Sequence, residues 1–507
     1  MLVSATAMPA SSAAPGVQID TGELRGHFSQ STYAFLGMPY AASTAGANRW
    51  RPPQPVARWS ETRDATVFGV DCPQGPPYEP PGGTPWSSGY LTHGATSEDC
   101  LSLNVWTPRL GVAAKLPVLV WIHGGAFAGG SGAVPIYNGA PLARRGIVVV
   151  TINYRLGVLG FMALPELTAE AGTSGNYGLL DQVAALQWVR RNIEKFGGDP
   201  DHVTIAGQSA GAASVQDLMA SPAAVGLFAR AIVESDPMLA PAMPALAAAE
   251  SQGMRVAAAA RTSTLAGLRS LPLARILAAG DDPAVGPPGI RYTPIRDGRV
   301  LPDPQRVASR VPILIGLTGD ETSTGGDDWR VDSVAGLRAL LERRFGEHAS
   351  QFATLYPAAT PAAARDAARA LLRERGVAAV LAWFDARPRE AEPAYAYLFD
   401  HVSGGTSGER FGVFHTAEVP YVFGTLEASG MRVTAQERRL AATVSSYWVN
   451  FVRTGNPNGA GLPAWPELAS GQLMLLRPEP SARAALPAAK RSAYAQYAAT
   501  GGALGLF

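Results

Sequence analysis

Charged residues are scarce in this sequence, and their two signs almost cancel. Asp, Glu, Lys and Arg make up 16% of the 507 residues, and the formal net charge is +1 at pH 7. About a quarter of a typical globular chain is charged. The sequence also lacks a basic stripe and any interleaving of aromatic and basic residues, the usual patterns for binding nucleic acid or an anionic membrane. We therefore expect a small neutral partner and no nucleic acid.

Long apolar runs, internal repeats and linkers are absent as well. No run of about eighteen apolar residues occurs, so no transmembrane helix is expected. No Gly/Ser linker, repeat period or charged run divides the chain, and hydrophobic residues make up 47% of it, which suits one large core. We predict a flexible N-terminal segment over residues 1–16 and a single domain over residues 17–507. The sequence does not indicate an oligomeric state.

Signals for a cellular compartment or a cofactor are few. Residues 1–16 are rich in Ala and Ser and lack the basic start and long apolar core of a signal peptide, so whether they are the trimmed tail of one is left open. Cysteine occurs only at Cys72 and Cys100, and two buried thiols or one disulfide both fit this count. Neither the cysteines nor the seven histidines show metal-ligand spacing. We expect no metal and no organic cofactor.

The most informative stretch that is present runs from Phe196 to Gly211 and reads FGGDPDHVTIAGQSAG. Its apolar, β-branched run suits a buried strand, and the Gly-x-Ser-x-Gly string that follows precedes residues able to form a helix. In such a strand, sharp turn and helix the flanking glycines avoid backbone collisions, and the helix N-terminus favours an oxyanion. The bare pentapeptide is weak evidence, but this setting makes Ser209 the candidate nucleophile.

Apolar runs and helix-period segments alternate along the chain, which predicts an α/β fold with a mostly parallel central sheet. Between two of these runs, apolar residues from Leu179 to Phe196 recur at spacings of three and four and predict a helix over one sheet face. Before the first run we expect a small antiparallel meander. The Ala-rich segment 240–282 is predicted to form irregular helices over the site. The Ala-rich segment 361–387 is predicted to form helix at the surface. The predicted buried strands are 116–122, 147–152, 203–206, 229–233 and 313–317.

The active-serine stretch resembles the signature of the type-B carboxylesterase family, which includes relatives of cholinesterases and bacterial para-nitrobenzyl esterases. Glu98–Pro108 (EDCLSLNVWTP) resembles the second signature of that family, and the resemblance extends from about Gly22 to about Trp465. It implies an α/β hydrolase fold with helical insertions over the active site. One departure is Gln208, where family members usually carry Glu.

A glycine-rich segment, His123-Gly124-Gly125-Ala126-Phe127, follows the predicted strand at 116–122. An oxyanion needs N–H donors on a backbone that can approach it closely, which small residues allow. The resemblance implies that the amides of Gly125, Ala126 and Ala210 are the donors, and an ordinary glycine turn is the alternative. His123 is interpreted as structural.

The general base is sought among the histidines that follow Ser209, because this architecture orders its triad as serine, acid and histidine. His348 fits a surface position, and His401, which follows a strand-like run, is the weaker candidate. His415 lies in GVFHTAEVPYVFG, which resembles the family motif around the catalytic histidine. A departure is Thr416, where glycine is usual.

The acid is expected after a strand between the serine and the histidine, and Asp320 and Glu321 follow the strand predicted at 313–317. The resemblance selects Glu321, with Asp320 as the alternative; Thr322 replaces the usual glycine. Glu321 would accept the Nδ1 proton of the histidine and stabilise the imidazolium.

The resemblance also implies four structural features. Cys72 and Cys100 would form a disulfide that closes a loop beside the active-site entrance, which favours a secreted or periplasmic protein and leaves a cytoplasmic one possible. A serine at Ser235 would lie near the catalytic acid, and a plain strand-end serine is equally plausible. Two ion pairs are expected: Arg49 with Glu98, and Arg155 with Asp181.

These observations together predict a serine carboxylic-ester hydrolase that works through an acyl-enzyme intermediate. The alternatives are a detoxifying ester hydrolase, a thioesterase or an amidase on the same fold, and a non-catalytic binding member of the superfamily. A non-catalytic member would be expected to lack a triad residue, whereas this chain carries all three. The elbow itself does not distinguish among the hydrolase chemistries.

Overall fold

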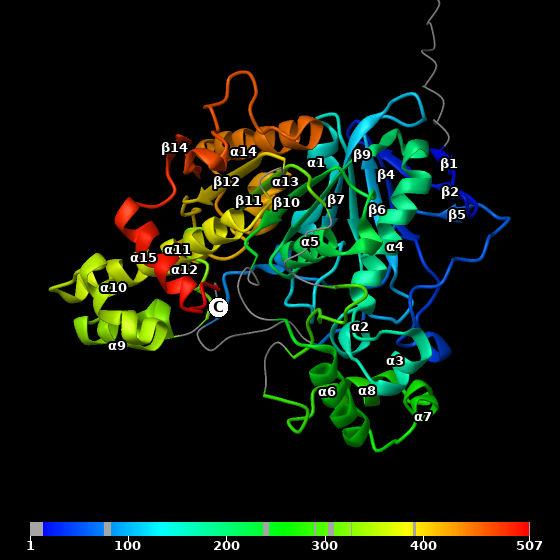
Figure 1. The fold of residues 1–507 in the computed structure, drawn as a ribbon. Coiled ribbons are helices and arrows are strands. Elements are labelled where there is room, and N and C mark those ends of the chain that lie inside the picture. The colour runs from blue at the N-terminus through cyan, green and yellow to red at the C-terminus, as the bar shows by residue number, and fades with distance from the viewer. Residues whose placement is uncertain are drawn as a thin grey trace, which may run out of the picture.

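An 11-stranded sheet forms the centre of the protein (Figure 1). The computed structural model describes residues 14–75, 83–236, 243–287, 291–302, 309–325, 327–388 and 392–505. Most of the N-terminal segment predicted to be flexible lies outside these residues. The strands, in spatial order across the sheet, are β14 (Ser481–Ala484), β13 (Gln472–Leu476), β12 (Ala394–Phe399), β11 (Ile313–Thr318), β10 (Arg230–Glu234), β9 (Gly198–Gln208), β7 (Leu116–Ile122), β8 (Val148–Ile152), β6 (Ser102–Thr107), β4 (Thr32–Pro39) and β3 (His27–Ser29).

The sheet is parallel at its centre and antiparallel at its two edges. All neighbouring strands from β8 through β13 pair in parallel. The β13–β14 pair at one edge and the β8–β6, β6–β4 and β4–β3 pairs at the other are antiparallel. The predicted α/β fold with a mostly parallel sheet is confirmed.

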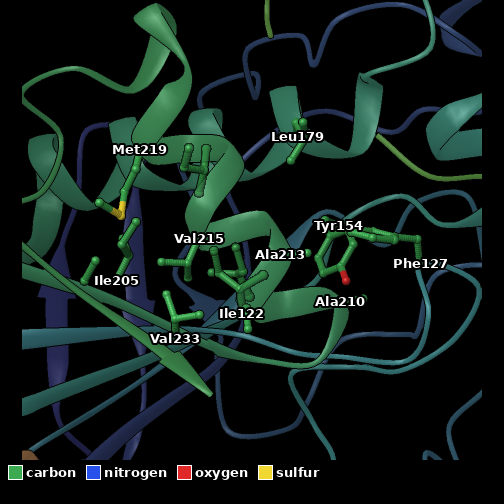
Figure 2. Close-up of a cluster of buried hydrophobic side chains, with 14 of the residues drawn as sticks. Ile122, Phe127, Tyr154, Leu179, Ile205, Ala210, Ala213, Val215, Met219 and Val233 are labelled. Atoms are coloured by element: carbon green, nitrogen blue, oxygen red, sulfur yellow. The ribbon is translucent and has the colours of Figure 1, made fainter. Parts of the chain in front are cut away.

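Helices cover both faces of the sheet, which explains why its central strands carry apolar residues at successive positions. In β7, Val118, Val120 and Ile122 point to one face and Leu119 and Trp121 to the other. Helices α4, α5 and α11 pack on the first face, and α1, α13 and α14 pack on the second. Figure 2 shows side chains of α5, such as Val215 and Met219, beside side chains of the neighbouring strands.

The remaining helices form two outlying groups (Figure 1). Helices α6, α7 and α8 lie with α2 and α3, and helices α9, α10 and α15 lie together elsewhere. The α-helices are α1 (Ala140–Ala143), α2 (Gly157–Phe161), α3 (Pro165–Ala171), α4 (Tyr177–Asn192), α5 (Ala210–Ala220), α6 (Leu246–Ala259), α7 (Leu265–Ser270), α8 (Leu273–Gly280), α9 (Val334–Phe345), α10 (Ala349–Leu355), α11 (Pro361–Asp385), α12 (Thr406–Phe411), α13 (Val419–Phe423), α14 (Ala435–Thr454) and α15 (Ala488–Ala499).

Two sequence-based expectations were wrong in detail. The expected N-terminal meander is divided: β1 (Gly16–Gln18) and β2 (Glu23–Arg25) join β5 (Arg63–Asp64) in a separate three-stranded sheet, whereas β4 belongs to the main sheet. Strand β4 belongs to the main sheet because it pairs with β6, and most of its residues are buried. Helix α11 was expected at the surface, but a long stripe of its residues is buried against the sheet. Its many alanines allow the helix backbone to approach the sheet closely.

Candidate active site

Ser209 occupies the sharp turn between β9 and α5. Its φ of 58° lies in the left-handed region, which residues other than glycine rarely adopt. Its N–H donates to the carbonyl oxygen of Glu234 on the adjacent strand at 2.9 Å, and its carbonyl accepts the N–H of Ala213 at 3.0 Å. The predicted strand, turn and helix are therefore present, and Ser209 lies at the carboxyl end of a central parallel strand, the edge where open α/β sheets place their sites.

The two glycines that flank this turn have no room for side chains. A Cβ atom on Gly207 would stand 2.4 Å from the backbone of Gly211. One on Gly211 would stand 2.0 Å from the carbonyl oxygen of Ile122, at the end of β7. Real Cβ atoms essentially never approach backbone atoms this closely, so the turn requires glycine at both positions.

The glycine-rich segment after β7 lies directly beside Ser209. A Cβ atom on Gly124 would stand 2.9 Å from the Cβ atom of Ser209. Gly125 and Ala126 have φ angles of 112° and 57°, so this backbone makes consecutive left-handed turns. Ala210 is the first residue of α5, where an N–H group has no acceptor within the helix. The segment and the helix start thus bring the three expected amides to the neighbourhood of Ser209.

His123, which begins the glycine-rich segment, is buried and neutral. Burial lowers its pKa to about 4, and the carbonyl of Gly124, 2.8 Å from its Nδ1, opposes that shift. Its ring stacks on Tyr154, whose hydroxyl donates to the carbonyl oxygen of His123 at 2.9 Å. These contacts hold the end of β7 in place, as expected of a structural residue.

His415 and Glu321 meet although 94 positions separate them in the chain. Nδ1 of His415 hydrogen-bonds Oε2 of Glu321, and both side chains are buried. Oε1 of Glu321 accepts the hydroxyl of Ser235 at 2.5 Å and the N–H of Thr318 at 2.6 Å. Although burial opposes ionisation of both groups, the His415 contact and these donors lower the pKa of Glu321, and Glu321 raises the pKa of His415. The pair is therefore poised as carboxylate and base.

Asp320, the alternative acid, contacts backbone atoms near His415. Its Oδ2 accepts the N–H of Val413 at 2.8 Å, and its own N–H donates to the carbonyl oxygen of Val413 at 2.9 Å. Its Oδ1 lies 3.4 Å from a guanidinium nitrogen of Arg373. The neighbouring acids thus have different partners. Glu321 contacts the imidazole of His415, whereas Asp320 binds the backbone of Val413, two residues before His415.

Gln208 packs against the ring of His415. Its amide nitrogen lies 3.1 Å from Nε2 and 3.5 Å from Nδ1 of His415, so it lies over the face of the imidazole. The structure records no hydrogen bond between the Ser209 hydroxyl and His415, both of which lie in its described part. The Nε2 lone pair, which a general base needs, lies in the plane of the ring and therefore does not point at the Gln208 amide.

Two further carboxyl groups lie behind Glu321, and the sequence analysis did not single them out as functional. Burial raises the pKa of Glu234 to about 8, although Trp448 Nε1 donates to its Oε1 at 2.7 Å. Burial, together with the charges of Glu234 and Glu321, raises the pKa of Glu418 well above its ordinary value. Burial thus favours the neutral form of both groups, whereas the contacts of Glu321 favour its ionised form. A signal was available for Glu234, which directly follows three apolar residues of its strand.

Cys72 and Cys100 form a disulfide, with Cα atoms 5.0 Å apart. Both expected ion pairs are also present and buried. Arg49 donates to both carboxylate oxygens of Glu98, at 2.7 and 2.6 Å, and Arg155 donates to both of Asp181, at 2.7 Å each. The arginine pairs are bidentate, a geometry that holds the chain segments they join in one orientation.

The two discarded histidines lie in other environments. His348 is in a short 3-10 turn between α9 and α10, and His401 Nε2 lies 2.9 Å from Oε2 of Glu437 at the start of α14. Within the described ranges, no group of three or more His, Cys, Asp or Glu residues is arranged to hold a metal ion. None of the described helices is long and apolar enough to cross a membrane.

Comparison with known proteins agrees with this geometry. Residues 13–495 match the model of the carboxylesterase family. The chain is 38% identical over 455 residues to the fumonisin B1 esterase of Sphingopyxis macrogoltabida, covering 85% of this chain and 81% of that one. It is 34% identical over 462 residues to the para-nitrobenzyl esterase of Bacillus subtilis (strain 168), covering 88% and 91%.

A solved structure is similar over nearly its whole length. The carboxylesterase of Geobacillus stearothermophilus superposes with a TM-score of 0.79 at 34% identity, covering 94% of this chain and 99% of that one. An α/β hydrolase fold is thus established. The chain belongs to the carboxylesterase family, and it is an enzyme that hydrolyses carboxylic esters.

Proposed function

We propose that this esterase works through an acyl-enzyme intermediate on a triad of Ser209, His415 and Glu321. The observation that carries the proposal is the contact of His415 with both Glu321 and the elbow. Glu321 binds its Nδ1, and Gln208, the residue before Ser209, packs its amide over the imidazole ring. A base oriented by an acid on one side and facing an elbow serine on the other is the arrangement that activates a hydroxyl.

In the first half of the cycle, Ser209 Oγ attacks the ester carbonyl while its proton passes to Nε2 of His415. The resulting imidazolium is stabilised by Glu321, whose lowered pKa keeps it ionised. His415 then gives the proton to the leaving alcohol, and the acyl group stays on Ser209.

The negative oxygen of the tetrahedral intermediate is assigned to the amides of Gly125, Ala126 and Ala210. Support comes from the close contact of the preceding Gly124 with Ser209, from the left-handed backbone of Gly125 and Ala126, and from the position of Ala210 at a helix start, where an N–H has no acceptor within the helix. In the second half, water replaces the alcohol and the same groups release the acid.

The substrate is proposed to be a small neutral ester, acted on by a single catalytic domain over residues 17–507. Gln208 supports a neutral alcohol group, because it provides an amide where a carboxylate would attract a cation. The Cys72–Cys100 disulfide supports a secreted or periplasmic location, where such bonds persist.

The proposal is tested by Ser209→Ala. The change removes one oxygen from an elbow that is built for small residues, so the protein should fold while turnover of a short-chain aryl ester falls by several orders of magnitude. Circular dichroism and thermal unfolding check the fold. A folded variant that keeps a substantial fraction of the wild-type rate would contradict the assignment of Ser209 as the nucleophile. A parallel panel of matched esters, thioesters and amides measures which acyl bond the wild-type enzyme prefers.

A further inference from the structure

Thr416, the residue directly after the base, has an unusual backbone conformation. Its φ is 82°, and a β-branched residue in this region is an outlier that surrounding contacts must hold in place. Its carbonyl accepts the N–H of Val419 at 3.2 Å, which leads the chain into α13. The direction in which the chain leaves His415 therefore depends on what stabilises Thr416.

The Thr416 side chain is held by a residue from a distant loop. The indole N–H of Trp86 donates to Oγ1 of Thr416 at 2.8 Å and approaches the carbonyl oxygen of His415 at 3.3 Å. One donor thus contacts the base's own backbone and the hydroxyl of the next residue. The threonine hydroxyl makes this contact possible, because glycine would offer no side-chain acceptor.

Trp86 is itself anchored on a closed loop. The loop begins and ends at the Cys72–Cys100 disulfide, and its described part is docked beside the 3-10 turn Leu426–Ser429. There Ser87 Oγ donates to the carbonyl oxygen of Ser429 at 2.7 Å. A Cβ atom on Gly89 would stand 1.7 Å from the carbonyl oxygen of Ala428, so the two backbones are in close contact. The loop backbone beside Trp86 is therefore fixed against the turn Leu426–Ser429.

We propose that Trp86 is a positioning residue for His415, acting through its hydrogen bond to the Thr416 hydroxyl. The bond holds the left-handed turn after the base and so keeps the imidazole aligned with Glu321. The inference rests on the proposed function of His415 and adds a residue that touches neither the serine nor the acid.

Two variants remove this hydrogen bond from opposite ends. Trp86→Phe keeps an aromatic ring and loses the N–H, and Thr416→Val keeps the β-branched shape and loses the hydroxyl. Each should lower kcat about tenfold with KM changed less than about twofold, since small misplacements of a catalytic group slow chemistry more than binding. The double variant should be no slower than the slower single one, and Thr416→Ser should retain most of the rate.

The pH profile provides a readout that a change in packing alone would not move. Among the residues that the structure describes, the ionisable groups that influence His415 are Glu321, at its Nδ1, and the buried Glu418. Because Glu321 raises the pKa of His415, a looser contact should move the acid limb of kcat/KM to lower pH in both variants. Trp59→Phe is the matched control, since it deletes an exposed indole bond to the carbonyl of Glu23 and should change neither parameter.

The outcomes are separable. Lower kcat with a shifted acid limb, without additivity in the double variant, supports the positioning role. A change confined to KM would indicate that Trp86 contacts substrate, and fully additive losses would show that Trp86 and Thr416 act independently; either result would overturn the inference. If Trp86→Phe fails to fold, Thr416→Val and Thr416→Ser still decide, because equal rates in that pair contradict the proposal. Failure of the proposed function is detected independently by an active Ser209→Ala enzyme.

Discussion

The elements that carry Ser209 and Glu321 differ in kind from the loop that carries Trp86. Ser209 follows β9 directly and Glu321 comes three residues after β11, at the end of a sheet covered on both faces, where glycine contacts and buried hydrogen bonds allow little movement. The loop between Cys72 and Cys100 reaches the site through a few side-chain bonds and a covalent closure. In the proposed mechanism the residues that follow the sheet strands are therefore required for chemistry, whereas the loop adjusts its rate.

The strongest test of the residues that follow the sheet strands compares the two neighbouring acids, Glu321 and Asp320. Glu321→Gln should lower kcat on the order of 10⁴-fold, because the amide no longer stabilises the imidazolium of His415. Asp320→Asn should cost much less, since its carboxylate contacts the Val413 backbone instead of the ring. Steady-state kinetics on one aryl ester, with circular dichroism as the folding control, measure both. Equal losses, or the reverse order, would transfer the role to Asp320.

The loop is tested by removing its covalent closure. Cys72→Ala with Cys100→Ala should lower the free energy of unfolding by about 3–4 kcal/mol, as expected for a loop of 28 residues. We expect kcat to fall less than about tenfold, because the sheet-borne groups stay in place. Chemical denaturation and kinetics of the folded fraction provide the two numbers. Unchanged stability, or a loss of rate as large as that of Glu321→Gln, would break the distinction between the two regions.

Gln208→Glu sharpens the comparison within the elbow itself. A carboxylate near Nε2 of His415 would favour the imidazolium, so the acid limb of kcat/KM should move to higher pH by about one unit, or about 1.4 kcal/mol. The wild-type limb should already lie above the ordinary histidine value of 6.5, because the pKa of His415 is raised by Glu321.

The same variant should also change substrate preference. A cationic ester should gain relative to a neutral isostere, whereas the wild-type enzyme should show no marked preference for choline-like esters. Profiles of kcat/KM against pH on the two substrates measure both effects. An unmoved limb together with an unchanged substrate ratio would remove the electrostatic interpretation of position 208.

The smallest expected effect concerns Glu234, buried behind the acid. Its pKa of about 8 in the folded state exceeds its ordinary 4.5, so folded protein keeps a proton that unfolded protein loses as pH rises between these values. This group therefore reduces stability progressively from about pH 4.5 to about pH 8. Glu234→Gln, which keeps an acceptor for Trp448, should raise Tm by about 2–5 °C at pH 8 and by little at pH 5. An equal change at both pH values would show that the carboxyl group is not held neutral.

The sequence predicted the sheet-borne part of the site far better than the loop. Buried strands read as apolar runs, and Gly207 and Gly211 flank the turn because no other residue fits there, so Ser209 could be located from local pattern alone. Choosing between Asp320 and Glu321 needed a family resemblance, because one residue of register decides which carboxylate meets the ring.

The contacts of Trp86 and Glu234 could not be predicted in this way. The first joins residues 330 positions apart through a side-chain bond that no periodicity encodes. The second depends on how completely Glu234 is buried, which follows from packing of α14 against the sheet, where Trp448 reaches it. Long-range side-chain contacts are set by the assembled core and are therefore the part that sequence patterns leave undetermined.

The long span of the Trp86 contact has a consequence for how the protein is made. During synthesis the elbow is made well before His415. More than half of the chain must be made after Trp86 before its partner Thr416 exists. Contacts between such distant segments form late in folding, because a large loop must close before they stabilise anything. Catalytic rate should consequently appear as the last signal during refolding, after the sheet has formed, and a chain truncated before His415 should hydrolyse nothing.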